Sequence, residues 1–372
     1  NINDFISRFV TRRSVSLFKE DLSINISSLK NKINDKSVLV IGGAGTIGSS
    51  YIKALLKFKP SKLVVVDINE NGLTELVRDL RSSSEFNIPN DFITYPINFG
   101  HKVFSKLFIN HGPFNIVANF AAHKHVRSEK DVFSIQAMIE NNLLQARNLL
   151  DLLLQYPPEH FFCVSTDKAA NPVNLMGASK KLMEELIMAY SSQINITTAR
   201  FANVAFSNGS LPSGFLERLN KKQPWSCPLG IKRFFVSPEE SGQLCLIASV
   251  LGNSGDIFFP KLDESKDMIP FEKIAKDLLK YLDLEIDVCN SEEEAKAKAS
   301  ILTNDSKKFP VYFFGSDTSG EKSFEEFYTE HETLDLEKFK NLGVIKNSVK
   351  RDLSEIDNIF KNLREIFSSN HV

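Results

Sequence analysis

The sequence predicts an α/β fold in which helices cover both faces of a doubly wound parallel sheet, with a smaller C-terminal domain. Short apolar runs typical of strands buried on both faces alternate with helical patterns between residues 37 and 201. A glycine-rich loop connects the first run to the first helix. After Arg200 the alternation stops, and turn-rich loops followed by charged helices indicate the second domain.

Composition excludes several classes of protein. The 372 residues suffice for two domains, and 45 Lys and Arg against 46 Asp and Glu leave no basic excess for a nucleic acid. No apolar run approaches the ~20 residues of a membrane span, and no signal peptide opens the chain. The four cysteines form no CxxC pair, which favours a reducing, cytoplasmic location. Asn1 is not an initiator Met, so an upstream membrane segment, which would place the protein at the inner face of the membrane, remains an open alternative.

Residues 1–35 predict a helical N-terminal appendage. Its apolar side chains recur at the spacing of one helix face, and they are Ile2, Phe5, Ile6, Phe9 and Val10. Such a helix could lie on a membrane surface. Docking on this protein or on a second subunit is the favoured alternative.

The first strand, Ser37 to Ile41, is followed at once by a GxxGxxG loop that opens a helix. Glycines there let the backbone turn tightly and approach a pyrophosphate, whose charge then rests on the helix N-terminus. The residues expected to bind a cofactor in this loop are Gly42, Gly45, Thr46, Ile47 and Gly48. The second strand, Lys62 to Val66, ends at Asp67, where an acid can bind the adenosine ribose. An Asp repels a 2′-phosphate, so NAD is favoured, with NADP as the alternative. A strand, a glycine-rich loop, a helix and a second strand that ends in an acid follow one another here, and this order predicts a Rossmann-like domain.

The next two strands are expected at Phe92 to Ile97 and Asn115 to Asn119. Asn119, Ala121 and Ala122 are expected beside the cofactor, because small residues allow the backbone to press against it. His123 and His125 form an isolated HxH without a third ligand, so no metal site is predicted. A long helix from Asp131 to Gln155 follows.

The fifth strand, residues 160–166, leads into Thr166, Asp167 and Lys168, and a helical pattern then runs from Met176 past Lys180. A hydroxyl, a carboxylate and an amine therefore lie at the carboxyl end of a buried strand, where open α/β sheets bind ligands. The sixth strand is Ile196 to Phe201.

The domain boundaries follow from these patterns. Residues 36–202 are assigned to the dinucleotide-binding domain, and a helix and strand within 234–259 are expected to return to it. Residues 203–233 and 260–372 are assigned to the substrate domain.

With these motifs in view, the chain resembles the extended short-chain dehydrogenase/reductase superfamily. More narrowly, Ser165 to Lys180 (STDKAANPVNLMGASK) resembles the UDP-N-acetylglucosamine 4,6-dehydratases of bacterial capsule, O-antigen and flagellin-glycan synthesis. Further stretches fit the same family, namely AHKHV at 122–126, RFANV at 200–204, GS at 209–210, RFF at 233–235 and GEK at 320–322. The resemblance spans roughly residues 36–330.

Two residues depart from the family's pattern. Four residues before the helix lysine the superfamily usually has a Tyr as base, whereas this chain has Met176, which carries no titratable proton. A branch of the capsule-type dehydratases resembles this chain in having Met there. Asn98 follows the third strand, where relatives tend to carry an Asp beside the adenine.

The resemblance implies a hydro-lyase that converts a UDP-N-acetylhexosamine to its 4-keto-6-deoxy sugar. It implies that Thr166 holds the C4 oxygen, Asp167 is the general acid and Lys168 is the base. Lys180 would bind the nicotinamide ribose and complete the catalytic set. The substrate-binding residues that it implies are Lys124, His125, Asn203, Ser210 and Arg233.

Two other functions remain open. A UDP-sugar 4-epimerase would leave Asp167 and Lys168 idle and usually relies on the missing Tyr, whereas a non-catalytic dinucleotide-binding protein would tolerate Met176. The sequence leaves open which base replaces the Tyr and whether C5 is inverted. The apolar helices at 131–155 and 176–192 predict a homo-oligomer, in the first instance a homodimer.

Overall fold

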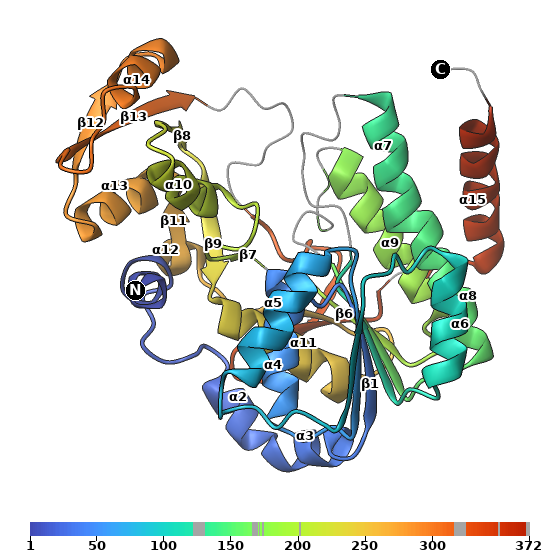
Figure 1. Ribbon diagram of the computed structural model, residues 1–372. Helices are drawn as coiled ribbons and strands as arrows, with labels where there is room; N and C mark the ends of the chain where they lie inside the picture. The colour runs from blue at the N-terminus through green and yellow to red at the C-terminus, as the bar shows by residue number, and fades with distance from the viewer. Residues whose placement is uncertain are drawn as a thin grey trace. The chain divides into compact units, whose positions relative to one another are not determined.

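The computed structural model describes residues 1–121, 131–165, 170, 172, 175–200, 202–315, 325–348 and 350–369. These divide into two compact units, which are described separately (Figure 1). Unit 1 comprises residues 1–17, 202–240 and 262–325, and unit 2 comprises residues 18–201, 241–261 and 326–372.

Unit 2 is built on one nine-stranded sheet with the order β14-β15-β10-β6-β5-β4-β1-β2-β3. Its strands are β1 (Ser37–Ile41), β2 (Lys62–Val66), β3 (Asp91–Tyr95), β4 (Ile116–Asn119), β5 (His160–Val164), β6 (Ile196–Ala199), β10 (Ile257–Pro260), β14 (Thr333–Asp335) and β15 (Leu342–Lys346). Strands β1 to β6 and β10 are parallel, and β15 pairs antiparallel with β10 and with β14. The order 3-2-1-4-5-6 is that of a dinucleotide-binding Rossmann fold, which confirms the predicted fold class.

Helices cover both faces of this sheet. They are α2 (Lys19–Ile24), α3 (Ile26–Ile33), α4 (Thr46–Leu56), α5 (Glu70–Arg81), α6 (Lys102–His111), α7 (Val132–Ile139), α8 (Gln145–Gln155), α9 (Leu175–Tyr190), α11 (Pro238–Leu251) and α15 (Leu353–Ser368), with a π-helical turn η3 (Glu140–Leu144) between α7 and α8. Figure 1 shows α4, α5 and α11 on one side of the sheet and α6, α8 and α9 on the other. Because both faces are covered, β1 and β2 bury every residue except their first.

Unit 1 contains two three-stranded sheets, ordered β11-β9-β7 and β12-β13-β8. Its strands are β7 (Asn203–Val204), β8 (Trp225–Leu229), β9 (Lys232–Val236), β11 (Met268–Pro270), β12 (Glu285–Cys289) and β13 (Lys308–Gly315). Its helices are α1 (Ile2–Phe5), the π-helical turn η1 (Ile6–Val10), α10 (Leu211–Asn220), α12 (Glu264–Asp267), α13 (Phe271–Tyr281) and α14 (Glu292–Ala299), and α11 begins at its edge.

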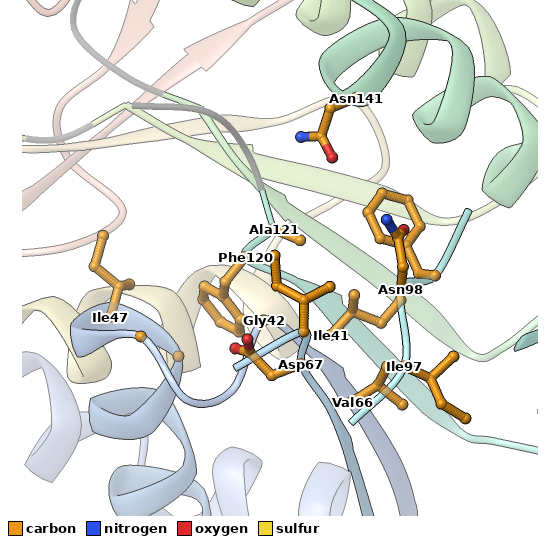
Figure 2. Close-up of a pocket in the computed structure, with 14 residues that line it drawn as sticks. Ile41, Gly42, Ile47, Val66, Asp67, Ile97, Asn98, Phe120, Ala121 and Asn141 are labelled. Carbon is orange, nitrogen blue, oxygen red and sulfur yellow. The ribbon is translucent and has the colours of Figure 1, made fainter. Parts of the chain in front are cut away.

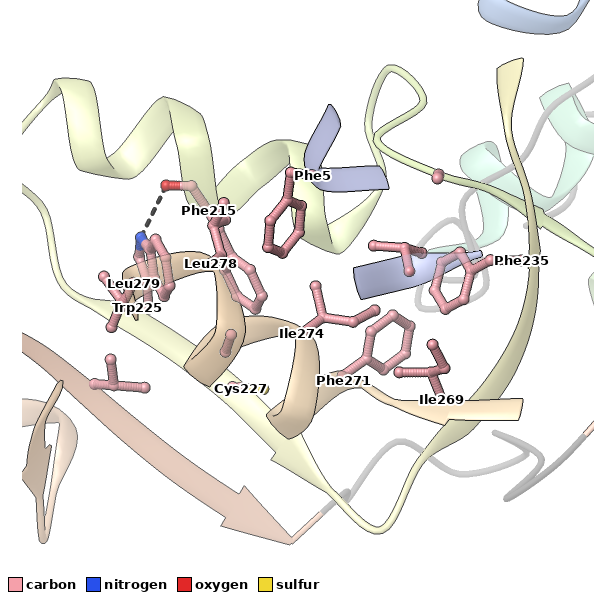
Figure 3. Packing of buried hydrophobic residues seen from close by; sticks show 14 of the residues in the cluster. Phe5, Phe215, Trp225, Cys227, Phe235, Ile269, Phe271, Ile274, Leu278 and Leu279 are labelled. Carbon is pink, nitrogen blue, oxygen red and sulfur yellow. Dashed lines mark hydrogen bonds between the residues drawn. The ribbon is translucent and has the colours of Figure 1, made fainter. Parts of the chain in front are cut away.

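Aromatic side chains dominate the core of unit 1 (Figure 3). Phe215 stacks on Trp225 with ring centroids 4.6 Å apart, and the indole N–H of Trp225 donates to the Phe215 carbonyl at 2.8 Å. The N-terminal helix belongs to this core. Phe5 is fully buried, and its ring centroid lies 5.4 Å from that of Tyr281. The amphipathic face predicted for the N-terminal residues therefore docks on this protein.

The structure divides the chain differently from the sequence in two places. Residues 18–35 join unit 2, where the buried Asp21 accepts backbone hydrogen bonds from Lys340 and Asn341 at 2.6 and 2.8 Å. Residues 326–372 also join unit 2, because β14 and β15 extend the large sheet beyond β10. The sequence patterns assign residues 1–35 to a single appendage and residues 260–372 to the substrate domain. In the structure both ranges are divided between unit 1 and unit 2.

Candidate active site

The carboxyl ends of β1, β2, β3 and β4 surround a cavity of about 270 Å³ in unit 2. Its lining residues are Ile41, Gly42, Gly45, Ile47, Gly48, Val66, Asp67, Ile68, Ile97, Asn98, Phe99, Phe120, Ala121 and Asn141. Figure 2 shows Asp67 close to Gly42, with Asn98 and Asn141 on other parts of the rim. This is the edge of an open α/β sheet at which ligands bind.

Two glycines give the loop its shape. Gly42 has φ +78°, and a Cβ there would lie 2.7 Å from the backbone N of Ala121. At Gly48 a Cβ would lie 2.3 Å from the carbonyl oxygen of Gly42, so α4 could not approach the loop this closely. Gly45 precedes α4 and has no side chain with which to bond the N–H groups of the first turn. Such an uncapped helix N-terminus is suited to a pyrophosphate.

Asp67 supports this loop and faces the cavity at the same time. One carboxylate oxygen accepts the backbone N–H of Ala44 at 2.9 Å, and the other accepts the backbone N–H of Asn69 at 2.9 Å. Each oxygen retains a second lone pair, which could accept a ribose hydroxyl. A 2′-phosphate would meet this negative charge, so the geometry favours NAD.

Of the residues predicted to bind the cofactor, six line the cavity, and they are Gly42, Gly45, Ile47, Gly48, Asp67 and Ala121. Thr46 and Asn119 lie outside its lining. Asn119 is buried, and its side-chain oxygen accepts the backbone N–H of Ala121 at 2.9 Å, so it shapes the turn after β4. The binding roles of all these residues stay predictions.

The sequence did not single out Ile68, Phe99 and Asn141 as lining residues, and it noted Asn98 only as a departure from the family. A signal existed for the first two, since each lies shortly after a parallel strand, like Asp67. The side-chain oxygen of Asn98 accepts the backbone N–H of Gly100 at 2.8 Å. Asn141 lies in the π-helical turn η3, and such turns occur frequently at functional sites.

Thr166, Asp167, Lys168, Ala122, Lys124 and His125 lie outside the described residues. The residues on either side of the proposed catalytic stretch are described. Ser165 follows β5, while Met176 and Lys180 lie in α9, and all three are buried, with exposed fractions of 4%, 1% and 6%. Burial raises the pKa of the nearby Cys163 to about 12, and the ammonium of Lys180 opposes that rise.

Two of the substrate-binding candidates of unit 1, Asn203 and Arg233, meet at a buried carboxylate that the sequence did not predict. Glu325 accepts the side-chain N–H of Asn203 at 2.6 Å and the backbone N–H of Phe234 at 2.7 Å, and Arg233 Nε lies 3.9 Å from it. Ser210 caps α10, where its oxygen accepts the backbone N–H of Ser213 at 3.3 Å.

A family described as polysaccharide biosynthesis protein matches residues 38–347. The chain belongs to this family. An uncharacterized membrane protein of Methanocaldococcus jannaschii is 31% identical over 324 residues, which are 85% of this chain and 87% of that protein. The UDP-N-acetylglucosamine 4,6-dehydratase (inverting) of Campylobacter jejuni is 28% identical over 242 residues, which are 63% of this chain and 69% of that enzyme. The predicted resemblance to the dehydratases is thereby confirmed.

Two further relatives of this polysaccharide biosynthesis protein bear on its function. The capsular polysaccharide biosynthesis protein CapD of Staphylococcus aureus is 27% identical over 268 residues, which are 71% of this chain but only 44% of CapD. The UDP-glucose 4-epimerase of Rickettsia rickettsii is 28% identical over 268 residues, which are 70% of this chain and 73% of that enzyme.

Solved structures share the fold at low sequence identity. Pen from Bacillus thuringiensis has a TM-score of 0.67 at 22% identity and covers 89% of this chain and 98% of its own. The dTDP-glucose 4,6-dehydratase DesIV of Streptomyces venezuelae, solved with NAD bound, has a TM-score of 0.59 at 16% identity and covers 78% of this chain and 88% of its own.

Within the described part of the chain, no helix has the length and apolar composition needed to cross a membrane. The same residues contain no cluster of three His, Cys, Asp or Glu side chains that could hold a metal ion. The pair His123 and His125 falls outside them.

Proposed function

We propose that this chain catalyses the NAD-dependent 4,6-dehydration of a UDP-N-acetylhexosamine, with UDP-N-acetylglucosamine as the expected substrate, for bacterial surface polysaccharide synthesis. The observation that carries the proposal is the register of two strands. β4, whose end leads to the cavity, pairs in parallel with β5, and Asn119 lies opposite Cys163. Thr166, Asp167 and Lys168 follow β5 by a few residues in the sequence, and a chain that continues from β5 would bring them to the same sheet edge as the cofactor cavity.

The reaction needs an acid and a base from the protein. Bound NAD would accept a hydride from C4 of the sugar and return it to C6 within the same turnover. The proton of the C4 hydroxyl would pass through Thr166 to Lys180 or Lys168. Asp167 would protonate the C6 hydroxyl as it leaves as water. Lys168 would take the proton from C5, and a proton would return to C5 when the hydride reaches C6. Each such group is typically worth ~10²–10⁴ in rate.

The pair must therefore exist with Asp167 protonated and Lys168 neutral. Free side chains prefer the opposite states at pH 7, with pKa values of about 3.9 and 10.4, and a direct ion pair would strengthen that preference. Neighbouring residues in extended backbone point to opposite sides, which would keep the two groups apart. Lys180 and a bound nicotinamide ring would add positive charge that disfavours a charged Lys168.

In the proposed substrate site, Asn203, Ser210 and Arg233 would bind the UDP pyrophosphate, with Lys124 and His125 placed near the sugar. Arg233 would contribute charge-assisted hydrogen bonds, which are the strongest that a phosphate can accept. Its guanidinium lies within 3.9 Å of Glu325, so this carboxylate would orient Arg233 toward the substrate.

The decisive experiment incubates the protein with UDP-N-acetylglucosamine and follows the sugar nucleotide by mass spectrometry. We expect the loss of one water per molecule, with catalytic amounts of NAD and no net NADH. Asp167→Asn should still oxidise C4, seen as NADH absorbance, yet lose no water, because an amide cannot protonate the leaving hydroxyl. Dehydration by Asp167→Asn at the parent rate would contradict the acid assignment and the mechanism with it.

A UDP-sugar 4-epimerase is the second candidate, since the Rickettsia relative carries that name. Epimerisation would leave the mass of the sugar nucleotide unchanged and convert UDP-N-acetylglucosamine to its C4 epimer. The same incubation distinguishes the two reactions, because only dehydration changes the mass. A non-catalytic dinucleotide-binding protein would change neither the mass of the sugar nucleotide nor its configuration at C4.

A further inference from the structure

Three buried polar side chains and one partly buried carboxylate form a connected cluster in unit 2 behind the end of β5. They are Ser165 after β5, Glu184 in α9, Arg200 after β6 and Glu332 before β14, and we call them the Glu184 cluster. Arg200 is 0% exposed, Glu184 2% and Ser165 4%. The Glu332 side chain is 14% exposed. Charged side chains are almost never buried to this degree unless they are paired.

Arg200 sits between the two carboxylates and bonds both through two nitrogens. Its Nε and Nη2 donate to Glu184 at 2.8 and 2.7 Å, and its Nη1 and Nη2 donate to Glu332 at 2.9 and 2.9 Å. Nη1 also donates to the carbonyl oxygen of Phe327 at 3.0 Å. Paired bonds of this kind fix the orientation of both partners as well as their distance.

The pKa shifts of Arg200 and Glu332 favour the charged form of both side chains. Although burial lowers the pKa of Arg200, the hydrogen bonds that it donates to Glu184 and Glu332, together with their negative charges, outweigh burial and raise that pKa. Burial raises the pKa of Glu332, but hydrogen bonds from Arg200 more than offset this, so the net shift is downward. Glu332 is further held by the backbone N–H of Thr329 at 2.8 Å.

Glu184 has a second partner at the end of β5. The hydroxyl of Ser165 donates to Glu184 at 2.6 Å, on the same oxygen that accepts Arg200 Nε. Ser165 is the residue before Thr166, and Glu184 lies one helical turn after Lys180 in α9. One carboxylate therefore joins the strand that leads to the proposed catalytic residues to the helix that carries Met176 and Lys180.

We propose that Glu184 is a positioning residue, held by Arg200 and Glu332, which sets the end of β5 against α9 through Ser165. The identity of the catalytic groups rests on the proposed function, whereas the bond between strand and helix does not. Positioning matters here because a displacement of about 1 Å of reacting groups can cost ~10²-fold in rate. A merely structural cluster would alter stability and leave the rate per folded molecule unchanged.

The first test replaces Ser165 with Ala, which breaks the bond to the strand but leaves Glu184 paired with Arg200. Ser249→Ala is the control for the loss of a buried hydroxyl, because Ser249 is 0% exposed; its hydroxyl donates to the carbonyl oxygen of Leu246 within α11 and accepts from the Tyr51 hydroxyl at 3.3 Å. Ser249→Ala loses both of these bonds, so we expect its melting temperature to fall at least as far as that of Ser165→Ala. Ser165→Ala should lower kcat for dehydration at least about tenfold with KM within about twofold. Ser249→Ala should keep both parameters at the parent values.

A conservative variant separates the hydroxyl from the loss of packing. Ser165→Thr keeps a hydroxyl that can donate to Glu184, and it should recover most of the kcat that Ser165→Ala loses. If Ser165→Ala has the same kcat as Ser249→Ala, the positioning role is overturned.

A second measurement keeps the inference independent of the reaction. Hydrogen exchange followed by mass spectrometry should show faster exchange in peptides covering 160–168 and 176–184 for Ser165→Ala, and parent rates there for Ser249→Ala. Unchanged exchange in Ser165→Ala would overturn the inference. A parent protein that fails to dehydrate UDP-N-acetylglucosamine would overturn the proposed function alone, and the exchange rates would then decide on Glu184.

Discussion

Met176 is 1% exposed in α9, four residues before Lys180, at the position where the superfamily usually has its Tyr base. A side chain so buried acts through packing, and Met has no titratable proton. Met176→Leu conserves volume, which usually costs less than about 1.5 kcal/mol of stability. We therefore expect turnover within about tenfold of the parent, or ~1.4 kcal/mol in the barrier. Steady-state kinetics of the purified variant measures this, and a larger loss would mean that the Met176 thioether takes part in C4 oxidation.

Asp67 carries a second prediction at the scale of one residue. Its two oxygens each hold a backbone N–H of the loop, and its charge faces the position of a 2′-phosphate. Asp67→Asn keeps the size of the side chain but removes the charge and one accepting oxygen. We expect weaker binding of NAD and a smaller preference for NAD over NADP, measured by calorimetry with both dinucleotides. An unchanged ratio of the two dissociation constants would show that Asp67 does not select the cofactor.

Of the predicted cofactor-binding residues that line the cavity, Gly42 and Gly48 share one property, which is that backbone geometry dictates their type. Gly42 and Gly48 lie where a Cβ would collide with neighbouring backbone, so the spacing of glycines predicts the loop. Glu325 and Glu184 carry no such signal. Each acquires its role through partners far along the chain, as Glu325 does through Asn203, and periodicity contains no information on such pairs.

Among the elements, the long helix predicted from Asp131 to Gln155 illustrates the limit of periodicity. The structure interrupts it with the π-helical turn η3 between α7 and α8. Within η3, Asn142 is buried and its amide donates to Ser179 in α9 at 3.3 Å. A π-helical turn keeps the backbone helical and changes only the hydrogen-bond spacing of one turn, so the sequence shows a single helix.

Strand β5 begins with His160, which is a buried neutral histidine. Thr197 donates its only hydroxyl proton to the Ala248 carbonyl oxygen at 2.6 Å, so it must accept from His160 Nε2, also at 2.6 Å. Burial lowers the pKa of His160 to about 3, with a smaller contribution from the charge of Lys32. His160 in this strand is therefore neutral at neutral pH.

This lowered pKa predicts how stability depends on pH. The unfolded chain protonates His160 near pH 6.5, whereas the folded chain does not until about pH 3. Because the unfolded state binds more protons in this window, acidification from pH 6.5 to 3 should lower the free energy of unfolding, by up to ~1.4 kcal/mol per pH unit. Urea unfolding at a series of pH values measures this slope.

The control for this prediction compares two histidine variants. His160→Gln should be less stable at pH 7 and show a shallower loss on acidification than the parent. His331 has a side chain that is 86% exposed, so His331→Gln should keep the parent slope. Equal slopes for His160→Gln and the parent would remove His160 as the source of the acid sensitivity.

At the scale of the whole molecule, the sequence predicted the sheet because parallel strands buried on both faces are continuous apolar runs, such as Val38 to Ile41. It did not predict that β14 and β15 return to the same sheet. β15 pairs antiparallel with β10, and β14 pairs antiparallel with β15, after the chain has passed through all of unit 1. Long-range pairing of this kind leaves no local pattern in the sequence. The boundaries predicted from local patterns therefore assigned residues 326–372 to the substrate domain.

The structure indicates which part of unit 2 the predicted homodimer would use. α15 already covers part of α8 and α9, because Ile356 and Phe360 are buried and Arg147 of α8 bonds Asp357 at 2.5 Å. Of the large apolar side chains in α7, α8 and α9, the most exposed lie at the start of α7, where Val132 is 51% exposed and Phe133 65%. Large apolar side chains exposed together are typical of a surface that binds another protein.

We therefore expect a dimer in light scattering at micromolar concentration, and we expect α7 to contribute to its interface. Phe133→Glu would place a charge in that interface, where an unpaired buried charge is strongly unfavourable, so the variant should shift toward the monomer. Ile301→Glu is the matched control, since Ile301 is 78% exposed in unit 1 and should leave the oligomeric state unchanged. A parent protein that is monomeric would refute the dimer, and a Phe133→Glu variant that remains dimeric would exclude α7 from the interface.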